Sequence, residues 1–131
     1  MRKRKYESDD PLERRRISHR ISYLNPVFRK KQLERARAWR AKLRLEVLIH
    51  YSGTNPPYCR QCGIDDMDVL CIDHINGGGN EHRRRLRLGT KPFLYWLRAT
   101  NYPEGYQVLC ANCNVKKEAL LRRQYGLFKE T

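Results

Sequence analysis

Two cysteine pairs, each with a gap of two residues, constrain this sequence more than any other feature: Cys59 with Cys62, and Cys110 with Cys113. The gap lets both sulfurs of a pair reach one tetrahedral ion, and two pairs supply the four ligands of a closed structural zinc site. One ion can hold both pairs only if segments that are distant in the sequence meet. The spacing therefore predicts a domain braced by Zn²⁺, with free buried thiols and a redox pair as the alternatives.

The fifth cysteine, Cys71, lies in an apolar run, residues 69–72, that predicts a short buried strand, and we expect it to pack in the core. Asp73 and His74 follow the run directly. Three glycines, residues 77–79, come next, where the backbone can turn sharply or approach a ligand closely. They could cradle a phosphate, but a flexible hairpin connection is the simpler interpretation, because no Gly-Lys-Ser/Thr completes a nucleotide-binding loop.

The chain has 131 residues, enough for one compact domain plus an appendage, and it is strongly basic. Lys and Arg number 28 against 14 Asp and Glu, which gives a net charge of +14. Residues 1–50 hold 16 of the basic and 6 of the acidic residues, so their share of the net charge is +10. This uneven excess indicates a polyanionic partner, and a purely solvated basic surface is the alternative.

The first five residues are basic, but polar residues 6–10 follow where a secretion signal would need an apolar core. No stretch approaches the ~18 apolar residues of a membrane span. Five cysteines without an export signal argue against a disulfide framework. We therefore expect a protein of the reducing cytoplasm.

Helical spacing dominates the N-terminal part of the chain. Residues 1–16 are polar, and we expect them to be frayed until something negative binds them. Three apolar residues then recur at helical spacing: Ile17, Ile21 and Leu24. Asn25-Pro26 indicates a new helix, with a capping Asn and Pro at the first helical position, and neither Pro nor Gly interrupts the sequence from there to Tyr51. Gly53 supplies the stop of this long basic helix.

The rest of the chain mixes helical and strand patterns. Residues 106–109 alternate as a second strand. Residues 91–99 predict a short amphipathic helix and residues 111–123 a final one. These elements predict an α+β protein, with a basic helical arm over 1–52 followed by a small zinc domain over 53–131.

The sequence from Tyr58 to about Lys117 resembles the HNH endonucleases, a branch of the ββα-metal nucleases whose motif is braced by a four-cysteine zinc knuckle. The resemblance rests on three motifs: Cys59-x-x-Cys62-Gly63, Ile72-Asp73-His74-Ile75, and Val108-Leu109-Cys110-x-x-Cys113-Asn114 followed by Lys116-Lys117. The glycine run and Tyr-Pro-Glu-Gly-Tyr-Gln before the second pair are similar to phage-encoded members. The resemblance implies a treble-clef-like ββα-metal domain, working in a bacterial or phage-infected host cell.

Family resemblance further implies that His74 is the general base that activates water, while Asp73 and Asn114 hold one divalent cation on the scissile phosphate. The residue types suit these roles, since a histidine with an ordinary pKa near ~6.5 accepts a proton at neutral pH. A carboxylate and an amide oxygen are a sparse set of hard ligands, as Mg²⁺ or Mn²⁺ prefers. Asn114 directly follows Cys113, so zinc binding would fix its position.

The sequence departs from the family pattern at two positions. The middle Asn that names the motif would fall near Gly105 or Tyr106, and neither side chain can replace it. In relatives that Asn mainly ties down the loop, so its absence bears on the rigidity of the hairpin more than on the chemistry. Asn114 stands where many relatives have His, and both types occur as metal ligands.

The expected partner is DNA, in double-stranded form, bound by a monomer that nicks one strand. The residues expected to contact it are basic: Arg37, Arg40 and Arg44 on the long helix, Arg83, Arg84 and Arg85 after the glycines, and Lys116 and Lys117 after the last cysteine. A solvated charge run is the alternative for the three consecutive arginines, and His82 receives no role. The competing hypotheses are a non-catalytic zinc-stabilised nucleic-acid-binding module and a protein that binds or cleaves RNA.

Overall fold

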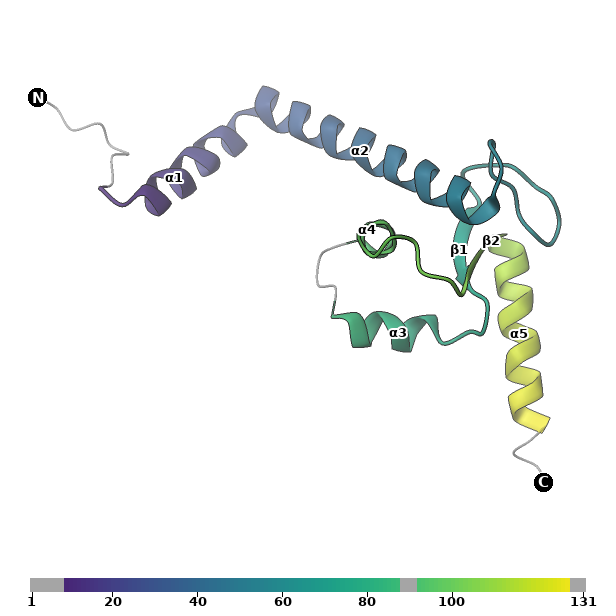
Figure 1. The fold of residues 1–131 in the computed structure, drawn as a ribbon. Coiled ribbons are helices and arrows are strands. Elements are labelled where there is room, and N and C mark those ends of the chain that lie inside the picture. The colour runs from purple at the N-terminus through teal and green to yellow at the C-terminus, as the bar shows by residue number, and fades with distance from the viewer. Residues whose placement is uncertain (1–8, 88–91, 128–131) are drawn as a thin grey trace, which may run out of the picture. The chain divides into compact units, whose positions relative to one another are not determined.

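A computed structural model describes residues 9–87 and 92–127, which form five helices and one antiparallel sheet of two strands (Figure 1). In chain order the elements are α1 (Pro11–Leu24), α2 (Pro26–Ser52), β1 (Leu70–His74), α3 (Gly79–Leu86), α4 (Phe93–Ala99), β2 (Tyr106–Cys110) and α5 (Ala111–Leu127). The predicted α+β class is confirmed. The chain divides into two compact units, Met1–Ala41 and Lys42–Thr131.

In the first unit, α1 and α2 each begin at a capping side chain, Asp or Asn, that is followed by Pro. Asn25 Oδ1 accepts hydrogen bonds from the backbone N–H groups of Val27 and Phe28, at 3.0 and 3.3 Å, so the predicted start of α2 is confirmed. Asp10 caps α1 in the same way and Pro11 follows it. The expectation that residues 1–16 are frayed is therefore wrong for residues 11–16, because Asp-Pro starts a helix before the arginine cluster. Residues 1–8 lie outside the described part.

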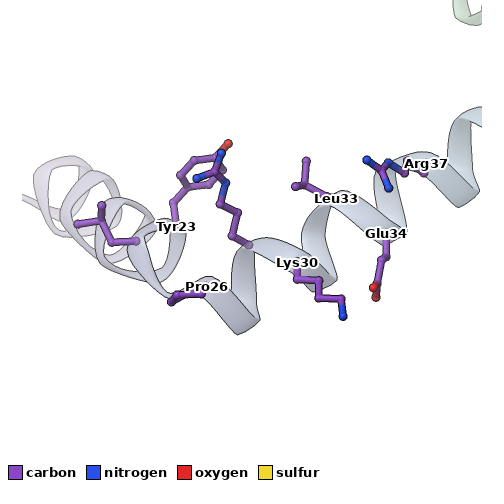
Figure 2. A pocket seen from close by; sticks show the side chains of 8 residues that line it. Tyr23, Pro26, Lys30, Leu33, Glu34 and Arg37 are labelled. Atoms are coloured by element: carbon purple, nitrogen blue, oxygen red, sulfur yellow. The ribbon is translucent and has the colours of Figure 1, made fainter.

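The junction of α1 and α2 forms an open hollow of about 460 Å³ (Figure 2). Tyr23 and Leu33 line it, and the Arg29 guanidinium carbon lies 5.5 Å from the centre of the Tyr23 ring. None of the residues of α1 is buried. Helix α1 therefore depends on its caps and its local sequence rather than on a core.

In the second unit, β1 and β2 pair antiparallel, with Leu70 opposite Cys110 at one end and His74 opposite Tyr106 at the other. The first strand is longer than the apolar run that predicted it, and Asp73 and His74 are its last two residues. Cross-strand pairing extends the strand beyond the apolar residues, since the Ile75 N–H also donates to the Gly105 carbonyl at 3.0 Å. The two polar side chains thus stand on a paired strand.

The core of this unit is small and receives residues from α2, α4 and both strands: Leu43, Val47, Leu48, Leu70, Ile72, Leu97, Val108 and Leu109. Arg44 Nη2 donates to the Leu70 carbonyl at 2.8 Å and fixes the end of α2 to β1. The last turns of α2 therefore belong to the core, while the expected division of the chain at residue 52 stays a prediction.

The remaining helix predictions are tested by the structure. Helix α2 ends at Ser52, and Gly53 follows with a φ of 74° and donates to the Ile49 carbonyl, as predicted. Helices α4 and α5 are confirmed, although the expected first residue of α4, Lys91, lies outside the described residues. Helix α3 was not predicted. None of the helices in the described segments combines the length and the hydrophobicity that a membrane span requires.

Candidate functional site

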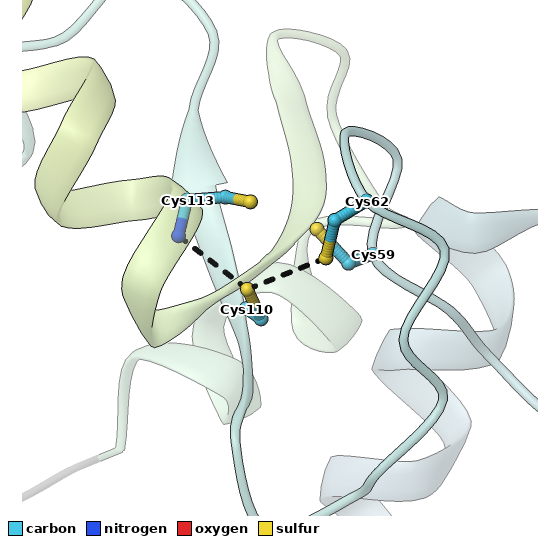
Figure 3. A group of neighbouring side chains, drawn as sticks. All are labelled: Cys59, Cys62, Cys110 and Cys113. Carbon is cyan, nitrogen blue, oxygen red and sulfur yellow. Dashed lines mark hydrogen bonds between the residues drawn. The ribbon is translucent and has the colours of Figure 1, made fainter.

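The four predicted zinc ligands come together in one cluster (Figure 3). The sulfur atoms of Cys59, Cys62, Cys110 and Cys113 all lie within 4.8 Å of one another, and the Cys62 and Cys110 sulfurs are 3.7 Å apart. A tetrahedral ion with Zn–S bonds of about 2.3 Å would separate two sulfurs by roughly 3.8 Å. The cluster therefore fits a metal ion such as Zn²⁺.

Backbone turns hold each pair in place. The Cys59 N–H donates to the Ile64 carbonyl and the Gly63 N–H to the Cys59 carbonyl, both at 2.8 Å, and Gly63 has a φ of 79°. This tight turn needs glycine. The second pair spans the end of β2 and the first turn of α5. A metal here would join the turn after residue 58 to the start of α5.

The pKa values of two cysteines of the cluster, Cys59 and Cys113, are shifted in opposite directions. Burial raises the pKa of Cys59, but backbone N–H groups around it, that of Cys62 first, lower it by more, so that its pKa is about 6. The pKa of Cys113 is raised to about 12, mainly by its hydrogen bond with Cys110. Sulfurs this close stabilise one thiolate at the expense of the others. A Zn²⁺ ion at this cluster would bind all four sulfurs as thiolates.

Asp73 is 5% exposed and lies in a polar network. Its Oδ2 accepts a hydrogen bond from Gln107 Nε2 at 2.8 Å and pairs with Lys117 Nζ at 2.6 Å. The Lys117 ammonium also donates to the His74 carbonyl. Lys117, which was expected to contact DNA, lies against the buried carboxylate. Both side-chain contacts use Oδ2, so neither engages Oδ1.

His74 is half-buried among aromatic rings. Its imidazole stacks on Phe93, with ring centroids 5.4 Å apart, and meets Tyr106 edge-on at 4.8 Å. Its Nε2 lies 3.0 Å from His82 Nδ1. Burial lowers the pKa of His74 below its ordinary value of 6.5, and the nearby His82 and Arg83 lower it further. The imidazole is therefore neutral at neutral pH, which is the form that accepts a proton.

Asp73, His74 and Asn114 line the same open cleft, which has a volume of about 540 Å³. Consecutive side chains of a strand point to opposite faces, so Asp73 and His74 approach this cleft from different sides of β1. Asn114, in the first turn of α5, donates from Nδ2 to the Cys71 sulfur at 3.7 Å. The cleft also receives basic and acidic side chains from two helices: Arg83, Arg84 and Glu81 of α3, and Arg122 and Glu118 of α5.

The other residues expected to bind DNA lie at several places. Arg85 is exposed on α3 and Lys116 is exposed on α5, beside a second groove that includes Cys62. Arg44 is half-buried and bonded to β1, whereas Arg37 and Arg40 are exposed in the first unit. Of the basic residues expected to contact DNA, Arg83 and Arg84 therefore line the cleft.

The residues of the site that were not predicted for it include His82, Gln107 and Arg122. Gln107 could have been found from strand pairing, because it lies directly opposite Asp73. His82 and Leu86 are half-buried and four residues apart, which is a helical signal that the preceding glycines mask. Arg122 reaches the cleft only because α5 passes it, and no local pattern marks that residue.

Comparisons of the chain with protein-family models, with curated proteins and with solved structures returned no match. Function is therefore inferred from the geometry of the cysteine cluster and the cleft.

Proposed function

We propose that the chain is a metal-dependent HNH-type endonuclease that hydrolyses a DNA phosphodiester, nicking one strand. The observation that carries this proposal is the convergence of Asp73, His74 and Asn114 on one cleft bordered by arginines. A neutral histidine beside two hard oxygen donors is what metal-assisted hydrolysis at neutral pH requires. DNA is a polyanion, and the net charge of +14 would favour its binding to the chain.

The donor set fits a hard divalent cation such as Mg²⁺ or Mn²⁺. Asp73 would offer Oδ1, since Gln107 and Lys117 hold Oδ2, and Asn114 would offer its side-chain oxygen, since its Nδ2 donates to Cys71. When bound, such a cation supplies a Lewis acid that offsets charge on the scissile phosphate and its leaving oxygen. The four cysteines would hold Zn²⁺ separately, as a structural ion.

The chain's own residues would divide the remaining work. His74 takes the proton of the attacking water, and the Phe93 and Tyr106 rings fix its orientation. Arg83 and Arg84 of α3 and Arg122 of α5 border the cleft and would bind phosphates of the cut strand. The zinc cluster fixes the first turn of α5, and with it Asn114.

A second candidate function is a non-catalytic zinc-stabilised module that binds nucleic acid. The Asp73–Lys117 ion pair favours it, because a carboxylate that already has an ammonium 2.6 Å away can serve as a structural partner. Under this alternative the arginines of the cleft bind phosphates and no bond is broken.

Supercoiled plasmid separates the two candidates. The zinc-loaded chain is incubated with plasmid DNA and Mg²⁺ or Mn²⁺, and the proposal predicts conversion to the open-circular form. Omission of the added cation, with zinc content and circular dichroism unchanged, should stop the reaction. Plasmid that is bound and retarded in a gel but stays supercoiled would favour the binding module, and preferential cleavage of RNA would redirect the substrate assignment.

A further inference from the structure

Two polar side chains outside the proposed metal ligands meet beside His74. The His74 Nε2 atom lies 3.0 Å from His82 Nδ1, and the Tyr106 hydroxyl lies 3.3 Å from the same nitrogen of His82. His82 comes from α3 and Tyr106 from β2, so two elements converge on an imidazole that β1 carries. The Trp96 ring meets His82 edge-on, with centroids 5.2 Å apart, and restricts the rotation of the His82 ring.

The hydrogen bond between the two imidazoles allows two positions of the shared proton. A bond between two neutral imidazoles needs one N–H donor and one bare nitrogen. Either ring can donate this bond, and the Tyr106 hydroxyl can donate to His82 Nδ1 or accept from it. With His82 Nδ1 as the acceptor, the proton of the histidine pair is on His74 Nε2. The lone pair of His74 is then on Nδ1.

The Nδ1 side of His74 faces Gly79. A Cβ atom at Gly79 would lie 2.9 Å from His74 Nδ1 and 3.2 Å from Cε1, so a larger residue would force the ring to shift. Glycine at this position therefore lets the backbone of α3 approach the His74 ring closely on the Nδ1 side, and both residues border the cleft.

We propose that His82 is a positioning residue for His74: it accepts the hydrogen bond of Nε2–H and so keeps the bare Nδ1 of His74 toward Gly79 and the cleft. This inference rests on the proposed function, in which His74 takes a proton from water. The water proton moves to Nδ1, the hydroxide oxygen bonds to phosphorus, the P–O3′ bond breaks, and the leaving O3′ takes a proton from solvent water. His82 then stabilises the imidazolium through the bond that it already makes.

Imidazole ¹⁵N NMR on the zinc-loaded full chain at neutral pH tests the tautomer without any need for activity. We expect His74 to carry its proton on Nε2 in the wild-type chain. His82→Asn should preserve this tautomer, because the Asn side-chain oxygen can replace Nδ1 as acceptor. His82→Phe should shift His74 to a mixture of tautomers. A wild-type His74 protonated on Nδ1, or a tautomer that His82→Phe leaves unchanged, would overturn the inference.

Nicking rates give a second readout. We expect His82→Phe to lower kcat by about 10- to 100-fold, the effect of removing a partner that orients a functional histidine, with KM for DNA unchanged. His82→Asn should recover most of the rate, and His19→Ala, on α1, serves as the control. If the tautomer responds as expected but the wild-type chain does not cut DNA, the proposed function fails and the role of His82 stands. Equal rates for His82→Phe and wild type refute that role.

Discussion

Asp73 and Lys117 form an ion pair in which the carboxylate side chain is only 5% exposed. We expect Lys117→Met to lower the free energy of unfolding by about 3 kcal/mol, because removal of one partner leaves a buried charge uncompensated. Urea unfolding of the zinc-loaded chain measures this loss. The Asp73→Asn/Lys117→Met double variant should be less destabilised than the two single losses added together.

The same pair offers a test of cation binding at Asp73. Mg²⁺ or Mn²⁺ should return part of the lost stability to Lys117→Met, because the cation replaces the missing ammonium, and should return none to the double variant. A Lys117→Met chain as stable as wild type would show that the pair contributes nothing to the fold.

His74 is the residue on which the proposed chemistry depends most directly. We expect His74→Ala to reduce nicking by about 10² to 10⁴, the usual contribution of a general base, while the melting temperature and the affinity for DNA change little. His50→Ala is the matched control, because His50 stacks on Tyr102 and lies outside the cleft lining. Wild-type nicking by His74→Ala would remove this residue from the mechanism.

At the scale of elements, the four-cysteine cluster connects the turn after residue 58 to the start of α5. We expect one Zn²⁺ per chain, and we expect a strong chelator to unfold the second unit. Structural zinc binding is itself folding free energy, with values of about 10 to 16 kcal/mol in finger peptides. Cys113→Ser should lose both zinc and fold, whereas Cys71→Ser should keep both. Metal analysis and thermal melts measure the outcome, and a folded chain without zinc would disprove a structural role.

The end of α2 is held by two half-buried tyrosines, and these predict a pH dependence. Tyr51 donates to the Pro103 carbonyl at 2.8 Å, and Tyr102 donates to Glu46 Oε1 at 2.5 Å. Burial raises the pKa of both hydroxyls from 10.0 to about 12, and in Tyr102 the hydrogen bond to Glu46 adds to the effect. Both groups stay neutral in the folded chain at a pH where the unfolded chain is already ionised.

The sign of this dependence follows from the raised values. The stabilisation is fully present below pH 10 and is lost as the pH rises toward 12. Urea unfolding at successive pH values should show the decline, and the Tyr51→Phe/Tyr102→Phe variant should show a smaller one. Equal declines in both proteins would mean that other groups cause the alkaline loss.

Sequence patterns predicted the long helix, both strands and the last helix, because caps and apolar spacing mark them locally. Helix α3 escaped prediction, since its first residue is Gly79 and it follows Gly78, whose φ is 77°, and glycine disfavours helices. In the folded chain, His82 of α3 contacts His74 of β1 and Trp96 of α4, which are tertiary contacts with other elements. The four-cysteine cluster was predicted from spacing, and Asp73 and His74 were singled out by the apolar run before them and by the family resemblance. The places of His82 and Arg122 depend on tertiary contacts that these patterns do not encode.

At the scale of the whole molecule, the charge is concentrated in the unit with the smaller share of buried residues. Residues 1–41 contain 14 Lys and Arg and 5 Asp and Glu, a net charge of +9, which leaves +5 of the total +14 for residues 42–131. None of the residues of α1 is buried, whereas Leu43 of α2 is 2% exposed. A truncation that begins at Lys42 therefore removes most of the charge and spares the core, as well as the Arg44 bond to β1.

We expect the chain that begins at Lys42 to melt cooperatively, bind Zn²⁺ and nick plasmid at low salt, but to bind duplex DNA with a flatter salt dependence. Each phosphate that the shortened chain no longer neutralises should reduce the slope of log affinity against log salt by roughly 0.9. Fluorescence anisotropy on one duplex at several salt concentrations measures both slopes. The full chain with Arg37→Gln and Arg40→Gln is the matched comparison, because both side chains are exposed and the helix is retained. A folded truncation with an unchanged slope would assign the phosphate contacts to the second unit, where Arg83, Arg84 and Arg122 border the cleft.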